Sequence, residues 1–248
     1  MIDLRLGRWE DVLADVDEVD AVICDPPYGD RTHAGHDAGV GLGGKRRSLC
    51  YTAWTVTHVH GFVQAWAPQT RGWMACMTSD DLIPAWRAAY AAAGLCDFAP
   101  VPWVAPGSRV RLAGDGPSCW TVYLMVARPR NIRMARWGTL PGAYTIGAAN
   151  HGTFAQGAQQ GRHIGGKPLP LMRAIVRDYS RPGDLVCDPC AGGATTLLAA
   201  AIEGRRAVGS EVDPETYAKA QARIARGYTP RMRFDQIKGE QQDLLEGA

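Results

Sequence analysis

Long apolar runs are absent from this sequence. Hydrophobic residues make up 46% of its 248 residues, which is enough to form a core. However, no stretch approaches the roughly 20 apolar residues that cross a bilayer as a helix. The first residues, MIDLRLGRWEDV, carry acids and contain no continuous apolar stretch, unlike a secretory signal. We therefore expect a cytoplasmic protein that makes no membrane contact and folds as a single domain over residues 1–248.

The sequence also lacks the cysteine pairs of a metal or disulfide framework. Its seven cysteines are an odd, scattered set, and the one C-x-x-C, Cys187 and Cys190, has no second pair to complete four zinc ligands. HAGH (33–36) and HVH (58–60) have ligand-like spacing but no partner cysteines and no nearby cluster of acids. We expect reduced thiols that pack as small apolar side chains and no metal site. A metal or redox role for the C-x-x-C is the weaker alternative.

Acids are nearly missing from the middle of the chain. Between Ala99 and Met172 there are eight arginines and lysines and one acid, Asp115, a net charge of +7 (8 − 1). The rest of the chain carries −5 (19 − 24). A concentrated basic segment in an otherwise acidic protein indicates nucleic-acid binding. The alternative is a solvated basic face that has no partner.

The hydrophobic pattern alternates between the periods of strands and helices. This order predicts an α/β fold with a mostly parallel, Rossmann-like sheet and helices on both faces. Two glycine-rich stretches without a clear period, 29–47 and 131–166, interrupt the alternation and are long enough to be functional loops. Strands are expected at 2–7, 20–25, 72–79, 96–104, 120–129, 184–189 and 206–212, and helices at 9–16, 55–68, 80–94, 169–179, 194–204 and 213–226.

A nucleotide-binding unit is expected near the C-terminal end, at GDLVCDPCAGGATTLLAAAIEGRRAVGSEVD. A buried strand ends at Asp188, a glycine turn and a helix follow, and a second strand ends at Glu211, which lies 19 residues after Gly192 (211 − 192). An acid at that position suits ribose hydroxyls. The spacing is not G-x-G-x-x-G, and Asp188 would repel a pyrophosphate. A ligand with an ammonium and a sulfonium, S-adenosylmethionine, fits better.

The stretch AVICDPPYGD places an acid, two prolines and a tyrosine at the tip of a buried strand. Strand tips are where parallel sheets bind ligands. An ordinary turn is the alternative, since proline and aspartate form turns.

Together these stretches resemble the DNA amino-methyltransferases of the circularly permuted β class. The resemblance rests on D-P-P-Y (25–28) near the start, Lys167-Pro168, DPCAGGATT and GSEVDPETY, and covers about residues 1–30 and 163–226 closely. Two departures stand out, because Cys190 replaces the family's usual phenylalanine and Ala194 replaces its second glycine. The resemblance implies methyl transfer from S-adenosyl-L-methionine to the exocyclic N6 amine of an adenine flipped out of double-stranded DNA.

The resemblance also implies the site residues. The carboxylate of Asp25 and the carbonyl of Pro26 would accept the two protons of the amine, Pro27 would hold that carbonyl rigidly, and Tyr28 would stack on the base. The expected cofactor-binding residues are Asp25, Gly166, Lys167, Asp188, Cys190, Gly192, Thr195, Glu211 and Asp213.

DNA contacts are expected in two segments between the catalytic and cofactor ends. The family places its target-recognition region there, which corresponds to an insertion at about 105–166 and a DNA-contacting loop at 29–50. We expect the loop to clamp the phosphate backbone and the insertion to contact base edges. The candidates are Arg31, Lys45, Arg46 and Arg47 in the loop and Arg130, Arg133, Arg136, Asn150, Gln156 and Gln159 in the insertion.

Several alternatives stay open from the sequence. The acceptor could be N4 of cytosine, an RNA base or a protein glutamine, and a non-catalytic nucleic-acid-binding module would keep the same fold. A C5-cytosine nucleophile at Cys190 would leave D-P-P-Y unexplained. No nuclease segment is visible, which is compatible with an orphan methylase or with a separate restriction nuclease, and a homodimer is compatible as well.

Overall fold

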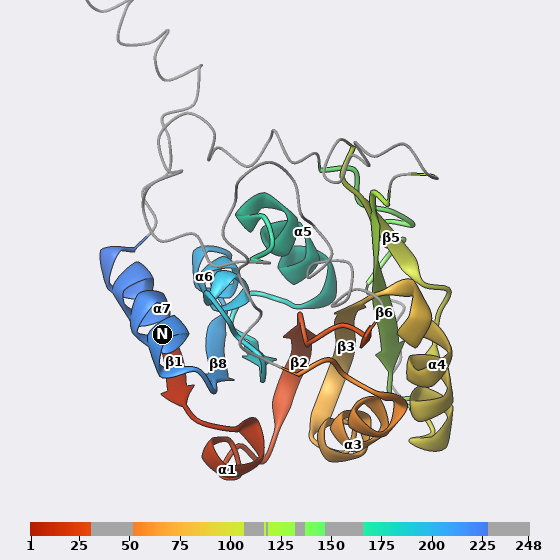
Figure 1. The fold of residues 1–248 in the computed structure, drawn as a ribbon, viewed down its shortest axis with the longest axis horizontal. Coiled ribbons are helices and arrows are strands. Elements are labelled where there is room, and N and C mark those ends of the chain that lie inside the picture. Colours follow the sequence, from red (N-terminus) through yellow and green to blue (C-terminus); the bar gives the residue numbers. More distant parts are fainter. Residues whose placement is uncertain (31–51, 107–116, 118, 132–136, 147–165, 228–248) are drawn as a thin grey trace, which may run out of the picture.

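The computed structural model describes residues 1–30, 52–106, 117, 119–131, 137–146 and 166–227 (Figure 1). Most of the expected DNA-contacting loop, 29–50, and much of the expected insertion, 105–166, lie outside the described residues. The strands are β1 (Ile2–Leu6), β2 (Val19–Cys24), β3 (Thr70–Thr78), β4 (Cys96–Asp97), β5 (Val101–Val104), β6 (Thr121–Arg128), β7 (Leu185–Asp188) and β8 (Arg206–Glu211). The helices are α1 (Trp9–Val12), α3 (Val56–Trp66), the short 3-10 helix η1 (Asp80–Leu82), α4 (Ile83–Ala92), α5 (Leu169–Tyr179), α6 (Thr195–Ile202) and α7 (Pro214–Arg226).

One eight-stranded sheet organises the fold. Its order is β1–β8–β7–β2–β3–β6–β4, with β5 also paired to β6. The first five strands in this order are parallel, and β6 runs antiparallel to β3, β4 and β5. The predicted α/β fold with a mostly parallel sheet is therefore confirmed.

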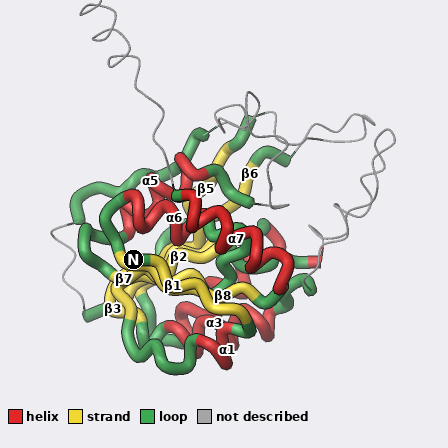
Figure 2. Tube along the Cα trace, turned by 90° about the vertical axis from the view of Figure 1, so that its left-hand side faces the viewer, coloured by secondary structure: helices red, strands yellow, loops and turns green. Residues whose placement is uncertain are grey.

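Helices cover both faces of the sheet, as Figure 2 shows from the side. Successive side chains of β2 alternate between two buried clusters because a strand points its residues to opposite faces. Ala21 and Ile23 pack with residues of α5 and α6, whereas Val22 and Cys24 pack with residues of α3 and α4. Burial on both faces explains why this strand is continuously apolar in the sequence.

Two expected elements differ from the structure. The helix expected over 9–16 ends at Val12, where the Arg5 guanidinium donates to the Val12 carbonyl at 2.6 Å and so takes an acceptor that a longer helix would use. The strand expected over 96–104 is split into β4 and β5. Pro100 lies in the interruption, and proline has no N–H to donate to a sheet ladder.

In the part of the chain that the structure describes, no helix combines the length and the hydropathy that crossing a membrane requires.

Candidate functional site

Three acids from distant parts of the sequence meet at one edge of the sheet. Val22 of β2 pairs with Cys187 of β7, and Asp188 pairs with Gly209 of β8. Since these strands are parallel neighbours, their carboxyl ends share an edge. Asp25 follows β2, Asp188 closes β7 and Glu211 closes β8. The D-P-P-Y segment and the segment 188–211, which are far apart in the sequence, are therefore adjacent in space.

Asp25 is held from two sides. The Tyr28 hydroxyl donates to one carboxylate oxygen at 2.8 Å, and Lys167 Nζ donates to the other at 2.5 Å. Both partners of this ion pair are mostly buried, with 22% of the Asp25 side chain and 10% of the Lys167 side chain exposed. The ammonium also lies 4.9 Å from the centre of the Tyr28 ring. Lys167, which immediately precedes Pro168 and α5, thus links the cofactor segment to the D-P-P-Y segment.

The loop that carries D-P-P-Y is anchored to its surroundings by backbone contacts. Gly29 N donates to the Ser79 hydroxyl at 3.2 Å, and Trp54 N donates to the Tyr28 carbonyl at 3.0 Å. A Cβ at Gly29 would lie 2.1 Å from a carboxylate oxygen of Asp81, so a larger residue at this position would require the Asp81 side chain to move. Pro26 is buried, and Pro27 is half-buried. These contacts fix the loop at the end of β3 as well as β2.

The turn between β7 and α6 is tight and internally bonded. Ala191 N donates to the Ser210 carbonyl at 2.8 Å, and the Ser210 hydroxyl donates to the Pro189 carbonyl at 2.8 Å. Gly192 has φ 51°, and Ala194, fully buried at the start of α6, has φ 59°. Ala194 is the one non-glycine residue with positive φ in the described part of the chain. The left-handed backbone explains why the resembling family has glycine at this position.

Replacing Ala194 with glycine is expected to stabilise the protein. An L-residue in the left-handed conformation costs roughly 1–2 kcal/mol. Glycine relieves this strain, but it also increases the entropy of the unfolded chain, which offsets part of the gain in stability. The free energy of unfolding of the Ala194→Gly variant should therefore be about 1 kcal/mol higher than that of the parent, which raises the thermal midpoint by roughly 2–4 °C. The matched control is Ala191→Gly in the same turn, where φ is not positive. It should destabilise, and a loss of stability in both variants would contradict strain at Ala194.

Asp188 is almost completely buried, with 1% of its surface exposed. Burial raises its pKa from 3.8 to about 6, the charge of Asp25 contributes in the same direction, and hydrogen bonds from Thr196, Cys24 and the backbone of Cys190 oppose the shift. The Cys190 N–H donates to the carboxylate at 3.2 Å. An acid that is costly to ionise at the edge of the sheet favours a cationic ligand.

The raised pKa of Asp188 predicts how stability depends on pH. A carboxyl that binds its proton more tightly in the folded state favours folding while protonated and penalises it once ionised. The free energy of unfolding should thus fall by about 3 kcal/mol as pH rises from about 4 to about 6, since two pKa units are worth that much. Asp188→Asn should remove this fall. The test is urea titration of both proteins across pH 3.5–7.5. The difference between their free energies of unfolding at each pH isolates Asp188, because all other carboxyls are common to both proteins. Parallel curves would contradict the assignment.

Glu211 and Asp213 close β8 and open α7. Asp213 N donates to Glu211 Oε1 at 2.7 Å, and Asp213 in turn accepts from Thr216 N at 2.8 Å as the N-cap of α7. Burial raises the pKa of Glu211, which is opposed by hydrogen bonds from the backbone of Asp213, Gly192 and Val212. The structure thus gives Asp213 a capping contact that sequence reasoning did not assign.

Arg223 of α7 supports the turn between β7 and α6, a role that was not predicted from the sequence. Its Nη1 donates to the Gly193 carbonyl at 2.7 Å and to the Thr195 hydroxyl at 2.9 Å, so it braces the turn from outside. Thr195, expected to bind cofactor, makes this contact. The signal was available, because Arg223 shares a helix face with the buried Thr216 and Ala220 at spacings of seven and three residues.

Cys187 and Cys190 of the C-x-x-C are free cysteines that form no disulfide with each other. Cys187 is fully buried, burial raises its pKa, and it packs in the core cluster beneath α3 and α4. Cys190 is half-buried and packs against the same cluster. A thiol whose pKa is raised is a weak nucleophile, so Cys187 is a poor candidate for nucleophilic chemistry.

Of the predicted nucleic-acid contacts, only Arg130 lies in the described part of the chain; the rest fall outside it. Arg130 is exposed and donates to the Gly94 carbonyl at 3.1 Å. It follows the end of β6, and because β6 is antiparallel to β3, that end lies away from Asp25. Gly166 is exposed and begins the segment that leads to Lys167. Arg130 as a DNA contact stays a prediction.

Comparisons with known proteins agree with this geometry. Residues 130–222 match the model of the N6_N4_Mtase family, described as DNA methylase. The chain is 34% identical over 82 residues to the type II methyltransferase M.HindIII of Haemophilus influenzae, covering 32% of this chain and 26% of that protein. It is 43% identical over 49 residues to the DNA adenine methyltransferase YhdJ of Escherichia coli K12, covering 20% and 17%. The matches thus span about a quarter or less of these relatives.

The fold as a whole is similar to solved structures. The M1.HpyAVI–SAM complex superimposes with a TM-score of 0.66 at 20% identity, covering 90% of this chain and 99% of that one. At such identity the similarity concerns the fold. Residues 130–222 of this chain thus carry the sequence pattern of the DNA methylase family, and they do so within a methyltransferase fold.

Proposed function

We propose that this protein transfers a methyl group from S-adenosyl-L-methionine to the exocyclic amine of a DNA base. The observation that carries the proposal is the adjacency of the D-P-P-Y segment after β2 and the acid-glycine turn after β7. A methyl acceptor held at the first would face a cofactor held at the second. The family match over 130–222 supports the same activity.

Asp25 is the proposed acceptor for the amine protons. An exocyclic amine is a poor nucleophile because its lone pair is delocalised into the ring, and hydrogen bonds to both protons localise that pair on nitrogen. A carboxylate offers about four acceptor positions, and Tyr28 and Lys167 occupy one on each oxygen of Asp25. Capacity therefore remains for an incoming N–H, while the two donors fix the orientation of the carboxylate.

The residues at the ends of β7 and β8 fit S-adenosylmethionine, which supplies an electrophilic methyl group on a sulfonium. Asp188 is a buried acid whose ionised form is costly in isolation, and a cationic ligand offsets that cost. Glu211, at the end of β8, would accept hydrogen bonds from ribose hydroxyls. Gly192 in this turn has φ 51°, a left-handed backbone that glycine adopts without the strain of a side chain.

N6 of adenine is the proposed acceptor and N4 of cytosine the alternative. The name of YhdJ supports adenine, as does aspartate in the first position of D-P-P-Y. The family model covers both N6-adenine and N4-cytosine methylation. Both bases present an exocyclic NH₂ group, so a carboxylate acceptor distinguishes little between them.

Double-stranded DNA is the proposed partner. The start of β6 lies at the same edge as Asp25, since Thr78 at the end of β3 pairs with Tyr123. The connection from β5 to β6 therefore leaves the sheet on the catalytic side, and it belongs to the expected recognition insertion at 105–166. Trp120, 42% exposed, lies at this end. Together with the net charge of +7 over residues 99–172, this placement supports DNA binding on the side of the sheet edge where Asp25 lies.

The test is nucleoside mass spectrometry of unmethylated duplex DNA after incubation with the protein and S-adenosyl-L-methionine carrying a labelled methyl group. We expect label in N6-methyladenine. Label in N4-methylcytosine would keep the methyl transfer and overturn the adenine assignment. No label in DNA, at protein concentrations that bind the cofactor, would overturn the proposed function.

A further inference from the structure

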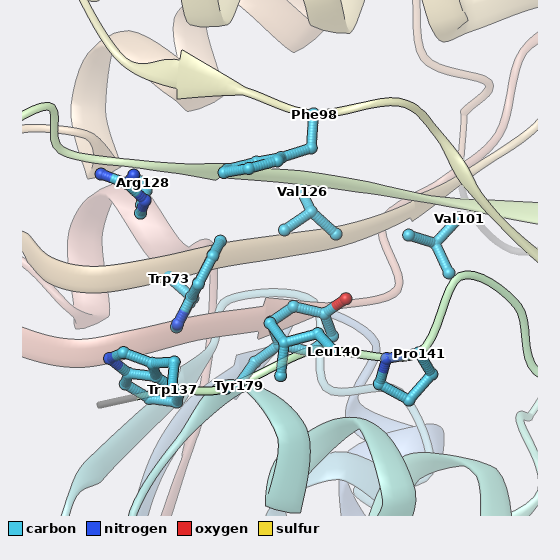
Figure 3. A pocket seen from close by; sticks show the side chains of 10 residues that line it. Trp73, Phe98, Val101, Val126, Arg128, Trp137, Leu140, Pro141 and Tyr179 are labelled. Carbon is cyan, nitrogen blue, oxygen red and sulfur yellow. The ribbon is translucent and has the colours of Figure 1, made fainter. Parts of the chain in front are cut away.

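A cavity lies well away from the candidate catalytic edge. It has a volume of about 320 Å³ and lies on the α5 side of the sheet, between β3, β6, the end of α5 and residues 137–141 (Figure 3). Trp73 in its wall lies five residues before the end of β3, roughly 16 Å along the strand from the catalytic edge. The volume is within the range of small-molecule sites.

The cavity has aromatic walls built around Trp73. The centre of its ring lies 5.5 Å from Phe98, 5.4 Å from Tyr179 and 5.8 Å from Trp137. In Figure 3, Phe98 lies on one side of the cavity, and Leu140 and Tyr179 lie on the other. A flat ring system between these walls would contact aromatic and aliphatic carbon on both faces.

The charged lining of this cavity is positive; the neighbouring acid Asp178 is not among the lining residues and accepts a hydrogen bond from Tyr144. Arg128 is the charged side chain among the described residues that line it, and its guanidinium lies 5.7 Å from the centre of the Phe98 ring. Arg181 lies over the Trp137 ring at 3.6 Å. Trp73 is 4% exposed, and its Nε1 donates to no described residue. Cationic and N–H donors at one end of an apolar slot favour an anion and oppose a cation.

The segment that closes the cavity is tied down at both ends. On one side, Trp137 stacks with Arg181. On the other, the Tyr144 hydroxyl donates to Asp178 at 2.7 Å, and Trp103 Nε1 donates to the Ile146 carbonyl at 3.0 Å. Anchored walls keep the slot open before a ligand arrives, which lowers the cost of binding.

We propose that this cavity binds a planar aromatic anion, a bicyclic ring system with one carboxylate. The ring lies between Phe98 and the Leu140–Tyr179 side, and the carboxylate faces Arg128. The site is separate from the methyl-transfer edge and does not depend on the function proposed for that edge.

The test is isothermal titration of the full chain with three probes of one shape: 2-naphthoate, neutral 2-naphthalenemethanol and cationic 2-naphthylmethylamine. We expect saturable 1:1 binding of 2-naphthoate, at least tenfold tighter than the alcohol, and no binding of the cation. Saturating S-adenosyl-L-methionine should leave the affinity unchanged. Equal affinities, no saturable binding, or displacement by S-adenosyl-L-methionine would each overturn the proposal.

Two variants locate the site. Arg128→Met should reduce the affinity for 2-naphthoate to that of the alcohol, and Leu140→Trp should abolish binding by filling the slot. Leu140 is half-buried in a loop, so its variant carries the test if Arg128→Met does not fold. Val56→Ala is the control, because Val56 is an exposed apolar residue of α3 outside the cavity, and this variant should bind 2-naphthoate as the parent does. Unchanged binding in Leu140→Trp would overturn the location.

Discussion

The Asp25→Ala variant is expected to lose methyl transfer by roughly 10³-fold or more in turnover, which is the range seen when a group that acts in the transition state is removed. Cofactor affinity should change little. Asp25 contributes to the raised pKa of Asp188, so its removal makes Asp188 easier to ionise, which offsets the loss of one negative charge beside a cationic ligand. The measurements are single-turnover transfer to duplex DNA and titration calorimetry with S-adenosyl-L-methionine.

Asp25→Asn separates charge from shape. Its amide must direct an NH₂ group toward Tyr28 or toward Lys167, so one of the two oxygens becomes a donor and fewer acceptor positions remain for the incoming amine. We therefore expect a loss close to that of alanine. Asp17→Ala, at an exposed acid before β2, is the control and should keep parental turnover. If Asp25→Ala stays within tenfold of the parent, the catalytic centre has been assigned to the wrong residue.

The Glu211→Ala variant is expected to raise the Kd for S-adenosyl-L-methionine at least tenfold. A charge-assisted hydrogen bond is worth about 1.5–3 kcal/mol, and 1.4 kcal/mol corresponds to a factor of ten. Turnover at saturating cofactor should fall much less, because Glu211 closes β8 two strands away from β2. Calorimetry together with turnover at several cofactor concentrations separates the two effects.

The control for Glu211 is Glu215→Gln in the first turn of α7. Glu215 is an acid of the same size four residues further on, and its side chain is 78% exposed and paired with Lys219. Surface pairs of this kind contribute little, so cofactor affinity should match the parent. Equal affinity in Glu211→Ala and the parent would mean that the β7–α6–β8 unit serves another ligand.

The order of helices and strands could be predicted because each element has its own local pattern of apolar residues, with acids or prolines at its ends. The helix expected over 169–179 is observed with those bounds, since apolar residues recur along one face and Pro168 precedes it. The strands that end at Cys24 and Asp188 could be predicted for the same reason, because each is a short apolar run followed by an acid and proline.

Contacts between distant segments could not be predicted from those patterns. Nothing near Lys167 in the sequence says that its ammonium bonds to Asp25, because that pairing follows from β2 and β7 being neighbours. The early end of α1 depends in the same way on Arg5, which reaches the Val12 carbonyl from β1. The departure at Ala194 was visible in the sequence, but its positive φ required the backbone.

The pairing of the sheet has a consequence for how the protein is made. Among the described residues, β1 pairs with β8 alone, so Ile2–Leu6 gain a strand neighbour only after Arg206–Glu211 have been synthesised. β2 likewise lacks one neighbour until β7 is synthesised, 163 residues after Asp25 (188 − 25). Contacts this distant in sequence slow folding. A nascent chain on the ribosome therefore exposes two unpaired strand edges, and the candidate catalytic edge can assemble only after residue 211 has left the exit tunnel. Chains whose synthesis stops before β7 would present those edges to aggregation or to chaperones.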